Sequence, residues 1–412
     1  MPRILAYTSP ARGHLYPLTP ILDVMQRRGY DVSVRTLAAE VPRMAARGFD
    51  AAPISAEVES VVHDDWQGGN PRAALVRAMR VFTARAEHDA ADLDRAIAHT
   101  SPDVLVVDIN CWGALAVAER WGGAWAAICP YPLALRAPEV PPFGPGWAPA
   151  RGVLGRLRDR LLGPLVLGTV DRAMRPGVNR VRRRVGVPEL ESADALFARP
   201  PLLLYLTAPP FEYARRSWPH NIRLVGPCAW EPPETPPAWL APIDRPIVLV
   251  TTSSEFQDDG VLVRTALDAL ADEPVFVVAT VPAGTPSDFA VPANARVEHF
   301  VPHGALLGRA ACAITHGGMG ATQKALAHGV PVCAVPFGRD QLEVARRVEV
   351  AGAGTRLPAS ALSVEALRAK VREAMACRDG AARVARGFTQ AGGAEAAADA
   401  LIALGHPINR SA

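Results

Sequence analysis

The sequence 313-AITHGGMGATQKALAHGVPVCAVPFGRDQ-341 decides the fold of this 412-residue chain. A buried strand is expected to end near Thr315, and a helix is expected over 319–328. The glycines between them allow the backbone to approach a ligand closely, and the free N–H groups and positive dipole end of a helix attract phosphate. The stretch therefore predicts a strand, a phosphate-binding turn and a helix, followed by another strand in VPVCAVP.

The same alternation of strand and helix surrounds this stretch in the second half of the chain. The runs IVLVT (247–251), PVFVVAT and ARVEHF read as further short strands, each bounded by turn residues. Strands that alternate with helices, without hairpin signals, form a parallel sheet with right-handed crossovers. The second half is therefore expected to be a Rossmann-like domain.

The first half carries a second set of the same units. Residues 3–7 read as a strand, 9–14 as a turn and 15–25 as a helix, and 31–36 read as the next strand. DVLVVD (103–108), a helix over 112–121 and AWAAIC (124–129) repeat the pattern. The predicted fold class is therefore α/β, with two doubly wound domains that bind ligands at the carboxyl ends of their strands.

Prolines divide the two halves. Eight of them fall between Trp218 and Pro246, where they exclude helix and inner strand. The predicted organisation is an N-terminal domain over 1–217, a linker over 218–246 and a C-terminal domain over 247–395. A tail helix over 396–412 is expected to pack back on the first domain.

Composition excludes several classes of protein. A net charge of +3 is too small for a nucleic-acid-binding protein, and the six cysteines show no spacing typical of a zinc site. No secretory signal and no apolar stretch of about 18 residues is evident. We therefore expect a soluble, cytoplasmic protein without a nucleic-acid partner.

The motif HGGxGxT, followed by GVPxxxxP and DQxxxAxRV, resembles the nucleotide-sugar site of family 1 glycosyltransferases of GT-B fold, especially the bacterial natural-product and macrolide type. The resemblance extends over essentially the whole chain. It implies two Rossmann-like domains that face each other across a cleft, and an enzyme that transfers a sugar from a UDP- or dTDP-sugar. The implied acceptor is a hydroxyl of a small apolar natural product such as a polyketide, a macrolide or an aromatic aglycone.

The resemblance also implies the donor-binding residues. The pyrophosphate would be bound by the HGG segment, the donor sugar by Asp340 and Gln341, and the base by the segment around Phe300, where Phe replaces the Trp of the family. The Thr252-Ser253-Ser254 loop departs from the Gly-Ser pair of many relatives. The predicted nucleotide-sugar-binding residues are Ser253, Ser254, Phe300, Val301, His316, Gly317, Gly318, Gly320, Thr322, Asp340 and Gln341.

The catalytic residues are predicted at the sheet edge of the first half. In the resembled family the histidine of a G-H-x-x-P segment, here His14, is the general base, since an imidazole can take the proton of an attacking hydroxyl. Asp108 ends a strand of the same sheet and can orient the imidazole. Direct displacement would invert the sugar configuration. No D-x-D dipeptide stands where it would hold a metal between phosphates, so neither a metal nor a cofactor is expected.

Acceptor contacts are expected from loops at the cleft, because such loops carry specificity. The resemblance favours segments near 63–70, 79–82, 111–112 and 131–147. The predicted acceptor-binding residues are Trp66, Met79, Phe82, Trp112, Tyr131 and Phe143. Packing roles for Met79 and Phe82 remain equally open.

Several alternatives stay open at this point. The segment 151–184 holds ten arginines against two aspartates; a solvated helical face over the core is favoured, and docking on an anionic membrane is the alternative. A sugar-nucleotide epimerase, a lipid-linked glycosyltransferase and a non-catalytic auxiliary homologue are the other functions considered. The protein is expected to be a monomer or a homodimer.

Overall fold

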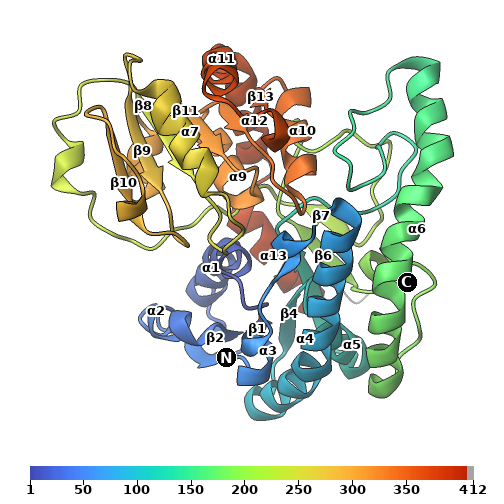
Figure 1. Cartoon of the computed structure of the whole chain (residues 1–412). Helices are drawn as coiled ribbons and strands as arrows, with labels where there is room; N and C mark the ends of the chain where they lie inside the picture. The colour runs from blue at the N-terminus through green and yellow to red at the C-terminus, as the bar shows by residue number, and fades with distance from the viewer. Residues whose placement is uncertain (406–412) are drawn as a thin grey trace.

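A computed structural model describes residues 1–405 and contains two α/β domains, each built around a parallel sheet (Figure 1). In this part of the chain the first sheet has the strand order β3-β2-β1-β4-β5-β6-β7 and the second has the order β10-β9-β8-β11-β12-β13. The GT-B architecture expected from the sequence is confirmed.

The elements of the first domain follow the predicted alternation. Its strands are β1 (Arg3–Tyr7), β2 (Asp31–Thr36), β3 (Asp50–Pro53), β4 (Val104–Asp108), β5 (Ala124–Cys129), β6 (Leu202–Tyr205) and β7 (Ile222–Leu224). Its helices are α1 (Arg12–Arg27), α2 (Val41–Ala45), α3 (Ala56–Ser60), α4 (Pro71–Thr100), α5 (Trp112–Trp121) and α6 (Gly152–Val185). The central strand β4 is buried along its whole length, as expected for a parallel sheet with helices on both faces.

The second domain repeats this plan. Its strands are β8 (Ile247–Thr251), β9 (Phe276–Thr280), β10 (Ala295–Glu298), β11 (Ala310–Thr315), β12 (Val332–Ala334) and β13 (Gly354–Arg356). The helices that follow β8 in the chain are α7 (Gly260–Leu270), α8 (His303–Leu307), α9 (Met319–Ala327), α10 (Gln341–Val350), α11 (Val364–Met375), α12 (Arg378–Gln390) and α13 (Gly393–Gly405).

Each sheet has one point at which the strand order reverses. The reversal lies between β1 and β4 in the first sheet and between β8 and β11 in the second. In open α/β sheets ligands bind at the carboxyl ends of the strands beside this point. His14 follows β1 and Asp108 ends β4, while Ser253 follows β8 and His316 follows β11. The topology therefore places the predicted catalytic and phosphate-binding residues at the two expected ligand sites.

The structure differs from the sequence-based expectation at two boundaries. Helix α1 already begins at Arg12, so His14 lies in its first turn and not in the preceding loop. Strand β7 lies inside the predicted linker 218–246, so the first domain extends beyond residue 217. Proline signals misplace this boundary because β7 is an edge strand of three residues, where nearby prolines are tolerated.

The last described helix returns to the first domain. Ala397, Ala398 and Leu401 of α13 are completely buried in the core that β1, β4 and α1 also form. Arg28 of α1 pairs with Glu395 and Asp399 of α13, at 2.6 and 2.5 Å. Figure 1 shows α13, in red, among the blue elements of the first domain. Residues 406–412 of the predicted tail lie outside the described residues.

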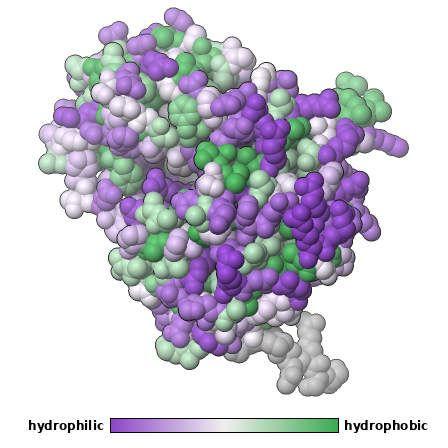
Figure 2. Space-filling model, turned by 60° about the horizontal axis from the view of Figure 1, so that its bottom comes forward, coloured by the Kyte–Doolittle hydropathy of each residue, from purple (hydrophilic) through white to green (hydrophobic). Residues whose placement is uncertain are grey.

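Helix α6 is only partly the solvated face over the core that the sequence favours. In its second half Val178 and Val181 are buried, and Arg182 pairs with Glu119 at 2.7 Å. In its first half several large apolar side chains are exposed instead, among them Leu154 at 82% and Leu161 at 62%. Figure 2 shows purple hydrophilic and green hydrophobic side chains side by side at the right-hand edge of the molecule, where α6 lies in Figure 1.

Candidate functional site

The predicted catalytic pair is in direct contact. Nδ1 of His14 lies 2.6 Å from Oδ2 of Asp108, and the carboxylate is almost completely buried. Two further groups fix the carboxylate, since Ser9 Oγ donates to Oδ2 at 3.1 Å and the backbone N–H of Asn110 donates to Oδ1 at 2.8 Å. A carboxylate at this position favours the tautomer of a neutral His14 that carries its proton on Nδ1, with Nε2 as the basic atom.

The surroundings of His14 favour its protonated form. Burial opposes protonation, but the carboxylate of Asp108 outweighs it, so the pKa of His14 is raised above its ordinary value. Glu255 and Asp340 act in the same direction as Asp108. Both belong to the second domain, so carboxylates of that domain contribute to the raised pKa of an imidazole on the first domain.

The turn that the sequence predicts to bind phosphate lies at the start of α9. His316 is almost completely buried, with Nδ1 3.4 Å from the carbonyl oxygen of Thr251. Burial lowers the pKa of His316. Gly317 has a positive φ of 84°, and a Cβ at Gly318 would lie 2.2 Å from Nε2 of His316. Glycine at these positions is therefore required for the turn and for the position of the imidazole.

Two predicted donor-binding side chains are engaged inside the protein. Thr322 is fully buried, with its hydroxyl 3.1 Å from that of Thr315. Gln341 accepts the backbone N–H groups of Phe337 and Gly338, at 2.8 and 3.0 Å, and donates to Gln257 at 2.7 Å. Thr322 therefore does not offer a free hydroxyl to phosphate, and Gln341 holds the loop that precedes it.

Asp340 lies differently from its neighbour Gln341. It is only partly buried, and its side chain does not cap α10. Burial raises the pKa of Asp340, while the charges of Arg339 and His14 oppose this rise. Of the two residues assigned to the donor sugar, Asp340 is therefore the one whose side chain is not engaged in capping its helix, whereas the amide of Gln341 is bonded to Phe337, Gly338 and Gln257.

The remaining donor positions divide between surface and core. Ser254 is exposed and Phe300 is 39% exposed, so both can contact a ligand. Ser253 is buried, and its backbone N–H donates to Asp259 at 2.8 Å. Val301 is buried in the core of the second domain. Ser253 and Val301 therefore support the loops that carry Ser254 and Phe300. Gly320 has open space at its Cβ position.

Polar contacts join the two domains around the cleft. Arg339 binds both carboxylate oxygens of Asp65 at 2.9 Å each and lies 3.3 Å from Glu255. The neighbouring ring of Trp66 meets Phe256 of the second domain with 5.1 Å between ring centroids. The two sheet edges therefore face one another, with Arg339 directly beside the candidate sugar-binding Asp340.

The predicted acceptor residues are not gathered in one place. Tyr131 lies beside His14, with ring centroids 5.9 Å apart. Phe82 packs against Trp112 at 5.3 Å and against His63 at 5.2 Å. Trp112 is buried in the core of the first domain, and Phe82 and Tyr131 pack against that core, whereas Trp66 contacts the second domain.

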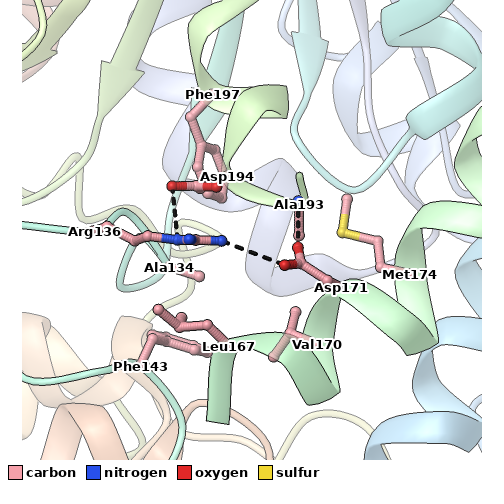
Figure 3. A pocket seen from close by; sticks show the side chains of 10 residues that line it. All are labelled: Ala134, Arg136, Phe143, Leu167, Val170, Asp171, Met174, Ala193, Asp194 and Phe197. Atoms are coloured by element: carbon pink, nitrogen blue, oxygen red, sulfur yellow. Dashed lines mark hydrogen bonds and ion pairs between the residues drawn. The ribbon is translucent and has the colours of Figure 1, made fainter. Parts of the chain in front are cut away.

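Met79 and Phe143 line other hollows. Met79 borders a surface groove between α4 and α6 of about 430 Å³. Phe143 lines a cavity of about 50 Å³ beside α6, together with Met174. Figure 3 shows that Arg136 spans its rim between Asp171 and Asp194. Neither hollow is lined by His14, so the expectation that both residues join the acceptor site at the cleft is not supported by their placement.

Sequence reasoning did not single out Asn110, Glu255 or Arg339 as site residues. Asn110 Nδ2 lies 3.3 Å from Nε2 of His14, and Arg339 spans the cleft. Asn110 follows the strand-end Asp108 by two residues, and this position at the carboxyl end of a strand could have identified it as a site residue. The contact between Arg339 and Asp65 joins residues 274 apart, so no local pattern could reveal it.

Within residues 1–405 no group of three or more His, Cys, Asp or Glu side chains could hold a metal ion. No helix in the same range is both long and apolar enough to cross a membrane.

Comparison with known proteins gives a consistent result. A family model described as "Erythromycin biosynthesis protein CIII-like, C-terminal domain" matches residues 264–404. The 4'-demethylrebeccamycin synthase of Lentzea aerocolonigenes is 36% identical over 386 residues, which cover 90% of this chain and 91% of that protein.

Solved structures show the same fold. The calicheamicin glycosyltransferase CalG4 aligns with a TM-score of 0.75 and 21% identity over 99% of both chains. The glycosyltransferase VinC, in complex with dTDP, aligns with a TM-score of 0.70 and 20% identity over 98% of this chain and 99% of that one. The fold, the two opposed ligand sites and the relatedness over nine tenths of the chain lead to one conclusion: the chain belongs to the family 1 glycosyltransferases of GT-B fold, and it is a natural-product glycosyltransferase.

Proposed function

We propose that this enzyme transfers a sugar, with inversion, from a nucleoside diphosphate sugar to a hydroxyl of a small apolar natural product. The observation that carries the proposal is the opposition of two sites across one cleft. His14 and Asp108 form a general base on the first domain, and the turn at His316 forms an anion site on the second. Asp340 connects them, because its charge acts on His14.

The donor side supports a diphosphate. The Gly318 to Gly320 segment presents the N-terminus of the nine-residue helix α9, whose dipole favours the negative charge that develops on a leaving diphosphate. VinC, which shares the fold, binds dTDP. A dTDP-sugar or a UDP-sugar is therefore the proposed donor, with Asp340 accepting hydrogen bonds from sugar hydroxyls.

The acceptor side supports an aromatic or otherwise apolar molecule. Tyr131 lies beside the imidazole of His14, and the partly buried Phe82 packs against the buried Trp112 in the same domain. Such surfaces bind flat apolar molecules through burial and stacking. A polyketide, a macrolide or an aromatic aglycone suits this wall better than a highly charged acceptor does.

The reaction balances as a direct displacement. The acceptor hydroxyl gives its proton to Nε2 of His14 while its oxygen forms a bond to the anomeric carbon. The bond from that carbon to the diphosphate oxygen breaks, and its electron pair leaves with the nucleoside diphosphate. The positive end of α9 stabilises this charge, so helix and turn fulfil the role that a divalent cation has in other transferases.

Chelation is expected to leave activity unchanged. Transfer should proceed at the same initial rate, within about twofold, after dialysis against EDTA and in the presence of added Mg²⁺, because α9 supplies the electrostatic stabilisation. Initial rates of nucleoside diphosphate release measure this. Loss of turnover on chelation that Mg²⁺ restores would show that the diphosphate needs a metal.

Mass spectrometry of products tests the proposal as a whole. The enzyme is incubated with a matrix of UDP- and dTDP-sugars and of phenolic, polyketide and macrolide aglycones. A product heavier than the aglycone by one sugar residue is expected. Conversion of the donor sugar without any aglycone would identify an epimerase, and absence of diphosphate release with every pair would favour a non-catalytic homologue.

A further inference from the structure

The basic atom of His14 is already in contact with an amide. Nδ2 of Asn110 lies 3.3 Å from Nε2 of His14, on the side of the ring opposite Asp108. Asn110 comes from the loop between β4 and α5, so β4 supplies both the carboxylate that fixes Nδ1 and the amide that meets Nε2. The protonation state of His14 therefore depends on which end of this amide faces it.

Tyr131 settles the orientation of the amide. Its hydroxyl donates to Oδ1 of Asn110 at 2.8 Å. Burial raises the pKa of Tyr131 well above its ordinary value, so the phenol keeps its proton. With Oδ1 occupied, the NH₂ group of Asn110 points to His14. An NH₂ group donates and cannot accept, so Nε2 must present its lone pair.

We propose that Asn110, oriented by Tyr131, is a positioning residue that keeps Nε2 of His14 unprotonated and holds the acceptor hydroxyl in the attacking position. This inference rests on the proposed function. Nδ2 and Nε2 are 3.3 Å apart, so an incoming hydroxyl lies beside the pair and not on the line between the two atoms. From there its oxygen accepts from the NH₂ group of Asn110, and its hydrogen points to Nε2. The same contact opposes a proton on Nε2 before the acceptor arrives, because two donors would then face each other.

The groups around His14 divide into two sets with opposite effects. Asp108, Glu255 and Asp340 favour the imidazolium form, and the net pKa of His14 is raised. Asn110 is the group that opposes it at Nε2. Since the base must be neutral, activity is expected to fall as pH decreases through this raised pKa. The acidic limb of kcat/KM should therefore lie above about pH 6.5, the ordinary pKa of histidine.

The substitution Asn110→Asp provides the sharpest test. A carboxylate at this distance accepts a proton-bearing Nε2 and stabilises the imidazolium. The acidic limb should move to higher pH, and kcat/KM at neutral pH should fall on the order of tenfold to a hundredfold and recover in alkaline buffer. Tyr131→Phe removes the hydroxyl that fixes the amide of Asn110, so the amide can rotate. This substitution should move the acidic limb of kcat/KM to higher pH by a smaller amount than Asn110→Asp does. Tyr30→Phe is the matched control, because the buried hydroxyl of Tyr30 has no hydrogen-bond partner in the described chain.

A second readout does not depend on turnover. The ¹⁵N resonances of His14 in the free enzyme should report a protonated Nδ1 and an unprotonated Nε2 at pH 8, and Asn110→Asp should delay deprotonation to higher pH. An Asn110→Asp enzyme with an unchanged pH profile and unchanged resonances would overturn the inference. If the wild type itself transfers no sugar, the proposed function fails, and the resonances still decide the inference about Asn110.

A separate observation concerns the outer face of α6. Val153, Leu157, Leu161 and Leu165 recur every four residues and so share one side of the helix. They are 72%, 48%, 62% and 65% exposed. Gly163 of the same segment is buried, so the helix rests on the protein by another side and directs its apolar stripe outward.

Free positive charge accompanies this stripe. Within the described chain Arg151, Arg156 and Arg160 form no ion pair, and Asp159 pairs with Arg158 at 2.7 Å. A two-fold dimer through this face would bring like charges together. We propose that the α6 face, meaning the exposed apolar stripe and these three arginines, docks on an anionic lipid surface, where cations and apolar side chains are both accommodated.

Vesicle co-sedimentation of the full-length protein tests this surface. Binding is expected to phosphatidylcholine vesicles that contain phosphatidylglycerol, with little binding to pure phosphatidylcholine. The combined substitutions Leu157→Glu and Leu161→Glu should weaken binding at least about tenfold. Val291→Glu, on an exposed valine of the second domain, is the control. Absence of binding at low salt would overturn the proposal, and so would a dimer that the same leucine substitutions dissociate.

Discussion

Replacing His14 by alanine is expected to lower kcat by about a hundredfold to ten-thousandfold, the range that a positioned general base contributes. Without the imidazole, the acceptor hydroxyl loses the base to which the proposed reaction gives its proton. Asp108 is almost completely buried behind His14 and already accepts hydrogen bonds from Ser9 and Asn110. Initial rates at saturating donor and acceptor measure the effect.

The affinity for nucleoside diphosphate separates a catalytic loss from unfolding in this variant. The turn at His316 belongs to the second domain, so His14→Ala should bind dTDP or UDP as the wild type does, by calorimetry, with an unchanged melting temperature. Asp108→Asn should also lower kcat, because an amide cannot hold the proton of His14 on Nδ1 in the same way. A His14→Ala enzyme that keeps more than about a tenth of the wild-type kcat would contradict the assignment of the base.

Adding one methyl group at Gly318 is expected to impair the donor site strongly. The new Cβ would lie 2.2 Å from Nε2 of His316, so the imidazole must leave its position at the turn. Loss of a preorganised group at a developing charge costs about a hundredfold to a thousandfold in rate. Gly318→Ala should therefore reduce kcat/KM for the donor by this factor, with the backbone fold retained, since φ at Gly318 is −65°.

A double-mutant cycle with His316→Ala identifies the cause. If displacement of the imidazole is the whole effect, Gly318→Ala should cost little in an enzyme that already lacks His316. Gly308→Ala is the matched control, because its Cβ position is open and lies outside the donor turn. Equal losses from Gly318→Ala in both backgrounds would mean that the backbone of Gly318, and not His316, meets the diphosphate.

The fold was predictable because its inner strands are continuous apolar runs. Residues 104–108 and 247–251 are buried at every position, and the sequence shows this directly. Strands β3, β6, β7 and β13 have three or four residues each and were not predicted. β3, β7 and β13 border the sheets and carry no long apolar run, whereas β6 is an inner strand whose short apolar run, residues 202–205, was not recognised.

The candidate site was predictable as a set of residues and less so as a set of contacts. Motifs placed His14 and Asp108 at one sheet edge, and the structure brings them to 2.6 Å. Nothing in the local sequence shows that the side chain of Gln341 is hydrogen-bonded to Phe337, Gly338 and Gln257. A side chain of the right type can serve a ligand or a loop, and only the positions of its neighbours decide which.

The return of α13 to the first domain affects how these enzymes can be recombined. A chimera that joins one protein's first half to another's second half at a single junction near residue 246 would place a foreign helix in the core beside α1. Ala397, Ala398 and Leu401 would be replaced at fully buried positions, and Glu395 and Asp399 would lose Arg28. Exchange of donor specificity between relatives therefore calls for two crossovers, the second before Gly393, so that each recipient keeps its own terminal helix.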